Sequence, residues 1–471
     1  MRTNNLQRGS LLLQVLVVGS IGIILLWSLV GLVRVDILSA RHYLAREQAF
    51  HLAEAGIEYY RWHLAHAPTD FEDGVGEPGP YVHDYYDKDG DLLGAFSLEI
   101  EPPLLGSTVV TITSTGVGAE SNLSRSIEAR LAISSLAKYA FISNSAVRYG
   151  AGTEVFGPIH SNDGIRFDGL AHNLVTSAKD KYDDPDHSGG LEYAVHTHVS
   201  PTDPLPPTAL PARPDVFAAG RTFPVPAIDF NWFTADISQM KTDAQADGLY
   251  FAASGALGYN LVLSTNDTFQ LYQVDSLVSP PSGCSSVGSQ SGWGTWSVNN
   301  QTLLGNYNFP NNGLIFLEDN VWVEGQINTA RLSIISARFP EDPGTNTSIT
   351  INKNLRYTNY DGQDVLALIA QKNINAGLVS NNTLTVDAGL VAKNGRAGRY
   401  YYGNNCSPYH QRDTITLFGM IASNQRYGFA YTNGTGYGIR NIIYDGNLLY
   451  SPPPSFPLTT DQYEVISWRE L

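Results

Sequence analysis

Four histidines in one loop-rich stretch are the first residues of this sequence whose types could do chemistry. His172, His187, His196 and His198 lie among several aspartates, and "HTH" (196–198) places two imidazoles on the same side of a strand. Imidazole nitrogens are common ligands of transition metals. The spacings match no strong zinc motif, however. We therefore expect solvated loop histidines here rather than a metal site.

A second candidate group is acidic. The stretch "DKDGD" (87–91) places Asp87, Asp89 and Asp91 at alternate positions around a glycine, and calcium loops use such oxygen ligands. The distal glutamate of an EF-hand is absent at the expected distance. The pattern favours an acidic Asp-Gly turn, with a calcium site as the weaker alternative and no other cofactor.

Three further carboxylates could serve an enzyme. Right-handed β-helix enzymes act on polysaccharides through carboxylates along a groove, and the nearest candidates are Glu154, Asp163 and Asp168. The chain has no HExxH, no GxSxG, no Walker loop and no dinucleotide fingerprint. Acidic residues beside glycines in turns need no catalytic role. We expect a protein that is not an enzyme, and a membrane-anchored surface β-helix enzyme acting on polysaccharides is the alternative.

Composition narrows the class of protein. The 471 residues carry 45 acidic and 29 basic side chains, a net charge of −16, which argues against nucleic acid as a partner. Abundant Gly, Pro and Tyr favour turns and strands over helices. The two cysteines, Cys284 and Cys406, could form one disulfide outside the cytoplasm, and two unpaired buried thiols are the alternative.

The N-terminus contains the longest predicted element. No charged residue occurs from Ser10 to Val33, a run of 24 residues that is long enough to cross a bilayer. The pattern then becomes amphipathic, and no proline interrupts it before Pro68. We predict one continuous helix from about Ser10 to His66, whose second half needs a partner to cover its apolar stripe. A secretory signal would have a shorter apolar region followed by a cleavage site.

These residues resemble the N-terminus of type IV pilin-like proteins. The resemblance rests on a short basic leader that ends at Gly9, an apolar helix that begins at once, and "REQAFHLAEAGIEYYRWHL" (46–64), and it is closest to large minor pilins and tip pseudopilins. It implies that a prepilin peptidase cuts after Gly9 and methylates the new N-terminus at Ser10. It also implies that the mature helices pack as the core of a filament.

One position departs from the family pattern. Major pilins carry a glutamate at the fifth mature position, which corresponds here to Gln14. In the family that carboxylate offsets the terminal amine of a neighbouring subunit, whereas an unpaired charge at membrane depth costs about 2.5–3.5 kcal/mol. A subunit with no neighbour above it would gain nothing from glutamate. Gln14 therefore favours an initiating or tip subunit, and a tolerated polar residue in a plain anchor is the alternative.

The rest of the chain has the composition of β-structure. Strand-like runs occupy 94–100, 107–116 and 124–133, which fits a small antiparallel sheet covered by the long helix, as in the pilin fold. Farther on, "GPIHSN" (157–162) returns as "GMIASN" (419–424), with looser versions at 367–373, 377–382 and 389–394. Short strands with asparagines at their corners indicate a parallel β-helix or solenoid. An ordinary β-sandwich is the competing fold.

The predicted organisation is α+β. It comprises a leader (1–9), a transmembrane and assembly helix (10–66), a small pilin-like sheet (67–135) and a β-helix-like domain (136–471) with an irregular insertion at about 170–300 that contains one helix near 229–248. The resemblance implies a minor pilin-like subunit that initiates or caps a type IV pilus or pseudopilus and displays its β-domain for subunit recruitment or adhesion. Its implied partners are other pilin subunits, the prepilin peptidase, the membrane assembly platform and, before assembly, membrane lipid. The implied location is a bacterial or archaeal-type cell membrane, crossed once, with the bulk of the chain outside the cytoplasm and a place at the filament tip on the cell surface.

Overall fold

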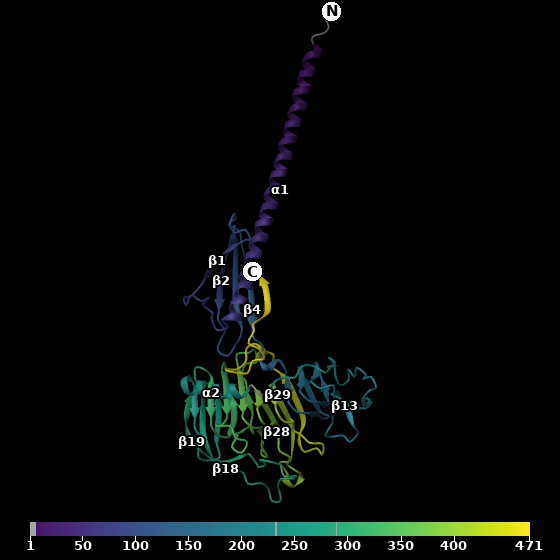
Figure 1. Cartoon of the computed structure of the whole chain (residues 1–471), viewed down its shortest axis with the longest axis vertical. Helices are drawn as coiled ribbons and strands as arrows, with labels where there is room; N and C mark the ends of the chain where they lie inside the picture. The colour runs from purple at the N-terminus through teal and green to yellow at the C-terminus, as the bar shows by residue number, and fades with distance from the viewer. Residues whose placement is uncertain (1–5, 231–232, 289) are drawn as a thin grey trace, which may run out of the picture. The chain divides into compact units, whose positions relative to one another are not determined.

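The chain forms two compact units. The computed structural model describes residues 6–230, 233–288 and 290–471 (Figure 1). The first unit, here the helix–sheet unit, comprises Met1–Pro102, Val110–Ala132 and Gln462–Leu471. The second, here the β-domain, comprises Pro103–Val109 and Ile133–Asp461. In the chain, the β-domain is therefore inserted ahead of the last strand of the helix–sheet unit.

The long N-terminal helix is present. Helix α1 spans Leu6–His66, so it ends at the predicted residue and begins within the expected leader. By length and composition alone, Leu11–His66 is long and apolar enough to cross a membrane, and the most apolar window of this helix is entirely unburied. The absence of proline and of charge between residues 10 and 33 lets one unbroken helix form here.

The sheet of the helix–sheet unit is antiparallel, as the sequence predicts. It has five strands in the order β1-β2-β3-β4-β31. Their bounds are Tyr81–Tyr86 (β1), Leu92–Glu101 (β2), Val110–Gly118 (β3), Ser124–Ala132 (β4) and Glu464–Glu470 (β31). Strands β2 to β4 fall at the predicted runs, whereas β1 lies ahead of the first run, where no strand is predicted. The C-terminal strand β31 pairs with β4, although the predicted boundary gave all of 136–471 to the β-domain.

The second half of α1 covers this sheet. One core joins the inner face of the helix to alternate residues of the strands, and it includes Ala53, Ile57, Tyr60, Leu64, Phe96, Leu98, Ile112, Ile127 and Leu131. Helix α1 can approach strand β3 closely because a glycine stands at their point of contact. A Cβ on Gly116 of β3 would lie 2.1 Å from the carbonyl oxygen of Ala49. The apolar stripe of α1 is thus buried against the sheet, which explains why this half of the helix is amphipathic.

Parallel pairing dominates the β-domain. Its first ladder contains β16 (Leu249–Phe251), β20 (Leu314–Leu317), β22 (Arg331–Ser336), β25 (Val365–Ala370), β27 (Thr383–Ala392), β29 (Gln411–Ser423), β5 (Phe141–Ser143), β8 (Ile159–Ser161), β11 (Val175–Ser177) and β15 (Arg221–Thr222). This parallel arrangement differs from the antiparallel sheets of an ordinary β-sandwich.

Two further sets of parallel strands accompany the first. The second ladder contains β17 (Tyr259–Ser264), β21 (Val321–Gln326), β23 (Ile349–Thr350), β26 (Ile374–Ala376) and β28 (Ala397–Arg399), and β6 (Val147–Tyr149), β9 (Ile165–Phe167) and β14 (Val195–His196) form a separate three-stranded sheet. The third joins the ends of β21, β27 and β29 to β24 (Leu355–Arg356), β30 (Gly436–Tyr444), β7 (Thr153–Phe156) and β10 (Leu170–Ala171). All three contribute side chains to one large buried cluster.

Antiparallel strands and short helices complete the β-domain. Strand β17 continues into a meander with β18 (Thr268–Leu277) and β19 (Val298–Asn308), while β12 (Lys181–Asp183) and β13 (Leu191–Tyr193) form a hairpin. Helix α2 spans Phe233–Asp247, close to the predicted helix. Short 3₁₀ helices occupy Leu136–Lys138, Asn404–Cys406 and Gly446–Leu449.

The order of strands in the first ladder differs from their order in the chain. Residues 141–222 stack on the far side of β29, and residues 249–251 begin the opposite end. Helix α2 lies between these two segments in the chain and packs on the outer face of the first ladder, where Ile237 and Met240 join a second core with Phe316 and Ile335. Much of the expected irregular insertion at 170–300 therefore belongs to the ladders.

The repeated sequence pattern has a structural basis. Ile421, Phe141 and Ile159 occupy consecutive positions of the first ladder, so "GMIASN" and "GPIHSN" lie in equivalent places on either side of β5. The asparagines that follow are hydrogen-bonded in a row: Asn144 Nδ2 donates to Asn424 Oδ1 at 2.9 Å, and Asn162 Nδ2 donates to Asn144 Oδ1 at 2.9 Å. The looser copies at 367–373 and 389–394 also lie on strands that pair with each other, β25 and β27, whereas 377–382 lies in a turn.

Candidate functional site

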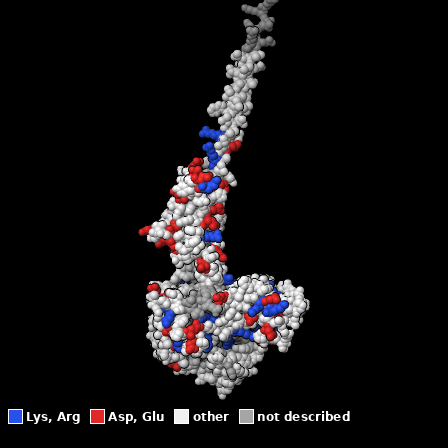
Figure 2. Space-filling view, viewed as in Figure 1, with Lys and Arg blue, Asp and Glu red and all other residues white. Residues whose placement is uncertain are grey.

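The uncovered part of helix α1 is the first candidate site. Apolar side chains from Leu11 to Leu44 are exposed, whereas Ala49 and Leu52 are buried against the sheet. In Figure 2 the described part of the helix is white until the first basic side chains appear. Gln14 lies in this exposed run, and Gly9 and Ser10 lie in the first turns of α1. An exposed apolar run of this length must be covered by lipid or by other helices.

The exposed apolar surface continues past the uncharged run. Val35, Ile37 and Leu38 are all about half exposed or more, and Tyr43 and Leu44 are exposed too. Charged residues already alternate with them, beginning with Arg34 and Asp36. A bilayer core would not cover this mixed stretch, because charged side chains at membrane depth are costly. The stretch therefore suits contact with another protein helix better than contact with lipid tails.

The predicted calcium group forms a hydrogen-bonded turn. Asp87 Oδ1 accepts hydrogen bonds from the backbone amides of Asp89 and Asp91, each at 2.9 Å. This is the turn-forming use of an aspartate side chain. The three carboxylates do not form one of the clusters of metal-ligating atoms found in the described residues.

The three carboxylates considered for catalysis have separate environments. Glu154 is close to His172, with 3.3 Å between Oε2 and Nε2. Asp163 Oδ1 accepts from the Gly164 amide, and Asp168 Oδ2 accepts from Arg166 Nε at 2.8 Å. None of the three lines the pocket between β17 and the turn after β26 that is described below. The structure therefore does not bring them together across a groove.

The two cysteines are joined in the structure. Cys284 and Cys406 form a disulfide between segments separated by 122 residues. Both side chains are buried beside Leu378, Tyr400 and Tyr402 in a small cluster of their own.

The histidines that sequence analysis singled out divide into two groups. His172 stacks on Phe156 with 4.0 Å between ring centroids, away from the others. His187, His196 and His198 instead surround one carboxylate, that of Glu192 in β13. The expected solvated state is wrong for His196, whose side chain is only 3% exposed, whereas the His187 side chain is 39% exposed. The carboxylate was missed by sequence analysis, although Glu192 lies four residues before His196.

A second buried carboxylate completes the cluster. Asp184 lies at the end of β12, and its Oδ2 is 3.7 Å from His196 Nε2 and 3.5 Å from Arg166 Nη1. Burial alone would raise the pKa of the Asp184 carboxyl, but the hydrogen bond from the Asp186 amide to Oδ1 and the nearby positive charge of Arg166 lower it below its usual range. Burial and the charge of Arg166 lower the pKa of the His198 imidazole.

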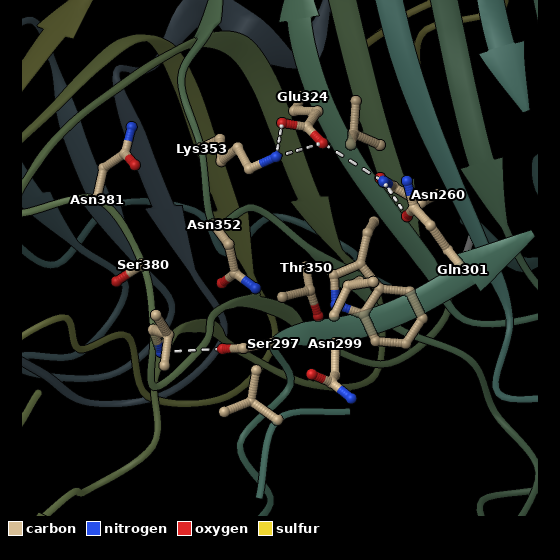
Figure 3. A pocket seen from close by; sticks show the side chains of 15 residues that line it. Asn260, Ser297, Asn299, Gln301, Glu324, Thr350, Asn352, Lys353, Ser380 and Asn381 are labelled. Atoms are coloured by element: carbon tan, nitrogen blue, oxygen red, sulfur yellow. Dashed lines mark hydrogen bonds and ion pairs between the residues drawn. The ribbon is translucent and has the colours of Figure 1, made fainter. Parts of the chain in front are cut away.

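A polar pocket lies at the end of the second ladder that begins with β17. It has a volume of about 430 Å³ and crosses β17, β19 and β21 and the turns after β23 and β26 (Figure 3). Figure 3 shows Lys353 directed at Glu324, with 3.0 Å between Nζ and Oε1, and Asn260 Nδ2 donating to Gln301 Oε1 at 2.8 Å. The other labelled side chains are hydroxyls and amides: Ser297, Asn299, Thr350, Asn352, Ser380 and Asn381. Paired charges and many neutral polar groups fit an uncharged polar ligand.

Comparisons with known proteins give little similarity. No protein-family model matches the chain. No curated protein matches it either. Among solved structures, the crystal structure of the competence-associated pilin ComZ from Thermus thermophilus matches with a TM-score of 0.32 and 14% identity, over 91% of this chain and 97% of that chain. We therefore base no conclusion about fold or function on this similarity.

Proposed function

We propose that this chain is a minor pilin-like subunit, not an enzyme, that initiates or caps a type IV pilus or pseudopilus. The observation that carries the proposal is helix α1. Its first part is apolar and exposed, its middle is mixed and exposed, and only its last part is covered by the chain's own sheet. A plain membrane anchor needs only the first part. An assembling pilin needs all three, because neighbouring helices cover the middle.

The leader and Gln14 support the same proposal. Arg2 and Arg8 precede Gly9, where a prepilin peptidase would cut to leave Ser10 as the methylated N-terminus. Gln14 can accept a hydrogen bond but carries no charge, so it suits a subunit with no neighbour above it. The assembly platform and other pilin subunits would then be its partners in the membrane, with the β-domain outside the cytoplasm.

The β-domain supplies the displayed part. We propose that its three sets of parallel strands, which share one buried cluster, form a parallel β-helix. A stack of short rungs is rigid and presents outward side chains in rows, which suits subunit recruitment or adhesion. The polar pocket between Asn260 and Asn381 is the surface of the β-domain that we assign to adhesion, because its hydroxyl and amide groups can bind an uncharged polar ligand.

Immunogold electron microscopy of the encoding organism tests the proposed position. An antibody against the β-domain should label filament ends, and deletion of the gene should reduce the number of filaments. Labelling along the full length of filaments would contradict the tip position. Label restricted to the cell envelope, with an unchanged number of filaments in the deletion strain, would contradict the pilin proposal itself.

A further inference from the structure

The buried cluster at the end of the β12–β13 hairpin has the composition of a metal site. Asp184, Glu192, His196 and His198 each direct one ligand atom at the others, and all four atoms lie within 4.8 Å of one another. We propose that these four side chains bind a zinc ion that fastens the β12–β13 hairpin to strand β14. This inference does not depend on the proposed function.

Two of the distances between ligand atoms are close to those of a tetrahedral zinc shell. Zinc binds imidazole nitrogen and carboxylate oxygen at about 2.0–2.2 Å, which places tetrahedral ligand atoms roughly 3.3 Å apart. His198 Nε2 lies 3.0 Å from Glu192 Oε1, and His196 Nε2 lies 3.7 Å from Asp184 Oδ2. His196 Nε2 and Glu192 Oε2 lie closer together than such a shell requires, so zinc binding would move this pair apart.

The contacts of the His196 ring give independent support for a metal site. Its Nδ1–H donates to the Tyr193 carbonyl oxygen at 3.1 Å, which leaves Nε2 facing the carboxylates of Glu192 and Asp184. This Nε2 has no hydrogen-bond partner in the described structure, although the side chain is 97% buried, with 3% exposed. It is directed at two carboxylates. A cation bound here would give this nitrogen and the two buried carboxylates a common partner.

Neighbouring residues hold the ligands in place. Asp168 Oδ1 accepts from the His198 amide at 2.9 Å, and Asp203 Oδ2 accepts from the Thr197 amide at 3.0 Å. Both contacts fix the backbone of the "HTH" segment. A backbone carbonyl on the far nitrogen of a ligating histidine, as at His196, is the usual outer contact of a metal-bound imidazole.

The donor set selects the ion and its role. Calcium and magnesium prefer shells made of oxygen atoms, whereas two imidazoles with two carboxylates suit zinc. Four protein ligands with little solvent access characterise a structural site. An isolated two-stranded hairpin is marginally stable, and here the connecting residues 184–190 contain two glycines. A zinc ion would stabilise this hairpin by linking both of its strands to His196 and His198.

A protonated cluster is the competing explanation. Three imidazoles contact Glu192, so imidazolium–carboxylate pairs could also hold the cluster together. His196 Nε2 faces both Glu192 and Asp184, so an imidazolium there would also have carboxylate partners. Metal uptake distinguishes the two, because ion pairs alone would leave no zinc affinity.

Zinc binding by the full-length chain in detergent tests the proposal. After purification with a chelator and incubation with zinc alone, the wild type should retain about one ion per chain and show a higher Tm with zinc than without it. Glu192→Gln and His198→Ala should each bind zinc at least about 100-fold more weakly and lose the Tm shift, since both remove a direct ligand. His172→Ala is the matched control, because this histidine lies outside the cluster, and it should behave as the wild type.

Cobalt gives a second measurement that does not depend on stability. Cobalt in the wild-type site should show the visible absorption of a tetrahedral ion, and this absorption should be absent from His198→Ala. A wild-type chain that retains neither ion would overturn the proposal. Equal zinc uptake by the wild type, Glu192→Gln and His198→Ala would also overturn it, because the ion would then be bound elsewhere.

Discussion

Asp387 shows how single buried side chains set the behaviour of the β-domain. This carboxylate is 1% exposed and accepts hydrogen bonds from the Tyr357 amide at 2.9 Å and the Tyr360 hydroxyl at 2.7 Å. Burial nevertheless raises the pKa of the carboxyl above its usual range. Asp445, also buried, has a raised pKa for the same reason, and the charge of Asp387 adds to that effect.

Asp387→Asn should flatten the dependence of stability on pH. A carboxyl whose pKa is raised on folding contributes stability that is fully present below its unfolded pKa, about 3.9, and is lost as pH rises through the folded pKa. The amide cannot ionise but keeps an acceptor for Tyr357 and Tyr360. The Tm of the variant, followed upward from pH 4, should therefore fall less than that of the wild type.

Asp361→Asn is the control for this experiment. Hydrogen bonds from the Gln363 backbone amide and then from its side chain lower the pKa of the exposed Asp361 carboxyl, so its contribution is lost as pH falls, not as it rises. Parallel Tm curves for the wild type and Asp387→Asn would show that the Asp387 proton is not coupled to folding.

At the residue scale, sequence analysis found the histidines but not their carboxylates. The spacing of His196 and His198 was visible as "HTH", and Glu192 was visible four residues earlier. Asp184 reaches the same place only because β12 and β13 pair across an intervening loop. Local spacing does not contain that information, which is why the histidines were expected to be solvated.

At the scale of elements, the contact between α1 and β3 fixes the helix–sheet unit. A Cβ on Gly116 would lie 2.1 Å from the Ala49 carbonyl oxygen and 2.5 Å from the Ala53 amide nitrogen, both of which are backbone atoms of the helix. Backbone in a packed helix cannot move aside as a flexible side chain can. The glycine thus allows the helix to approach the sheet closely.

Gly116→Ala should destabilise the helix–sheet unit by about 1–3 kcal/mol, the usual cost of overpacking. The matched control is Gly118→Ala in the same strand, where the added Cβ would meet only the end of the Gln48 side chain at 3.3 Å. The control should change the free energy of unfolding by less than about 0.5 kcal/mol. Equal effects of both substitutions, measured by chemical denaturation in detergent, would contradict the close contact.

The elements found from sequence are those with strong burial patterns. Helix α1 and strands β2 to β4 have buried residues at regular spacing, so their periodicity predicts them. Strands β1 and β31 are mostly exposed and have no such alternation. They are the two edge strands of the sheet, and without a regularly buried face they show no alternation that the sequence could reveal.

At the scale of the whole molecule, the strands of the β-domain pair in an order that differs from chain order. The strand that is late in sequence, β29, lies between β27 and the early strand β5. The repeat of "GPIHSN" as "GMIASN" predicts similar short strands, and the two copies, at β8 and β29, occupy equivalent places on either side of β5. The order of the strands depends on pairing between segments that are distant in the chain, and no local sequence pattern specifies that order.

The disulfide links two distant segments of the β-domain. Replacing both Cys284 and Cys406 by serine should lower the free energy of unfolding by about 2–4 kcal/mol, because the bond closes a loop of 122 residues in the unfolded chain. Chemical denaturation with and without a reductant measures this effect. The reductant should destabilise the wild type and leave the double variant unchanged, and an unchanged wild type would contradict a stabilising disulfide.

The mature N-terminus gives the most direct test of the central claim that α1 is a processed assembly helix. Mass spectrometry of the chain, from cells with and without active prepilin peptidase, should find a peptide that begins at methylated Ser10 only when the peptidase is active. Replacement of Gly9 by valine should block this processing in the same way. An N-terminus at Met1 in both strains would contradict the pilin assignment and leave α1 as an ordinary anchor.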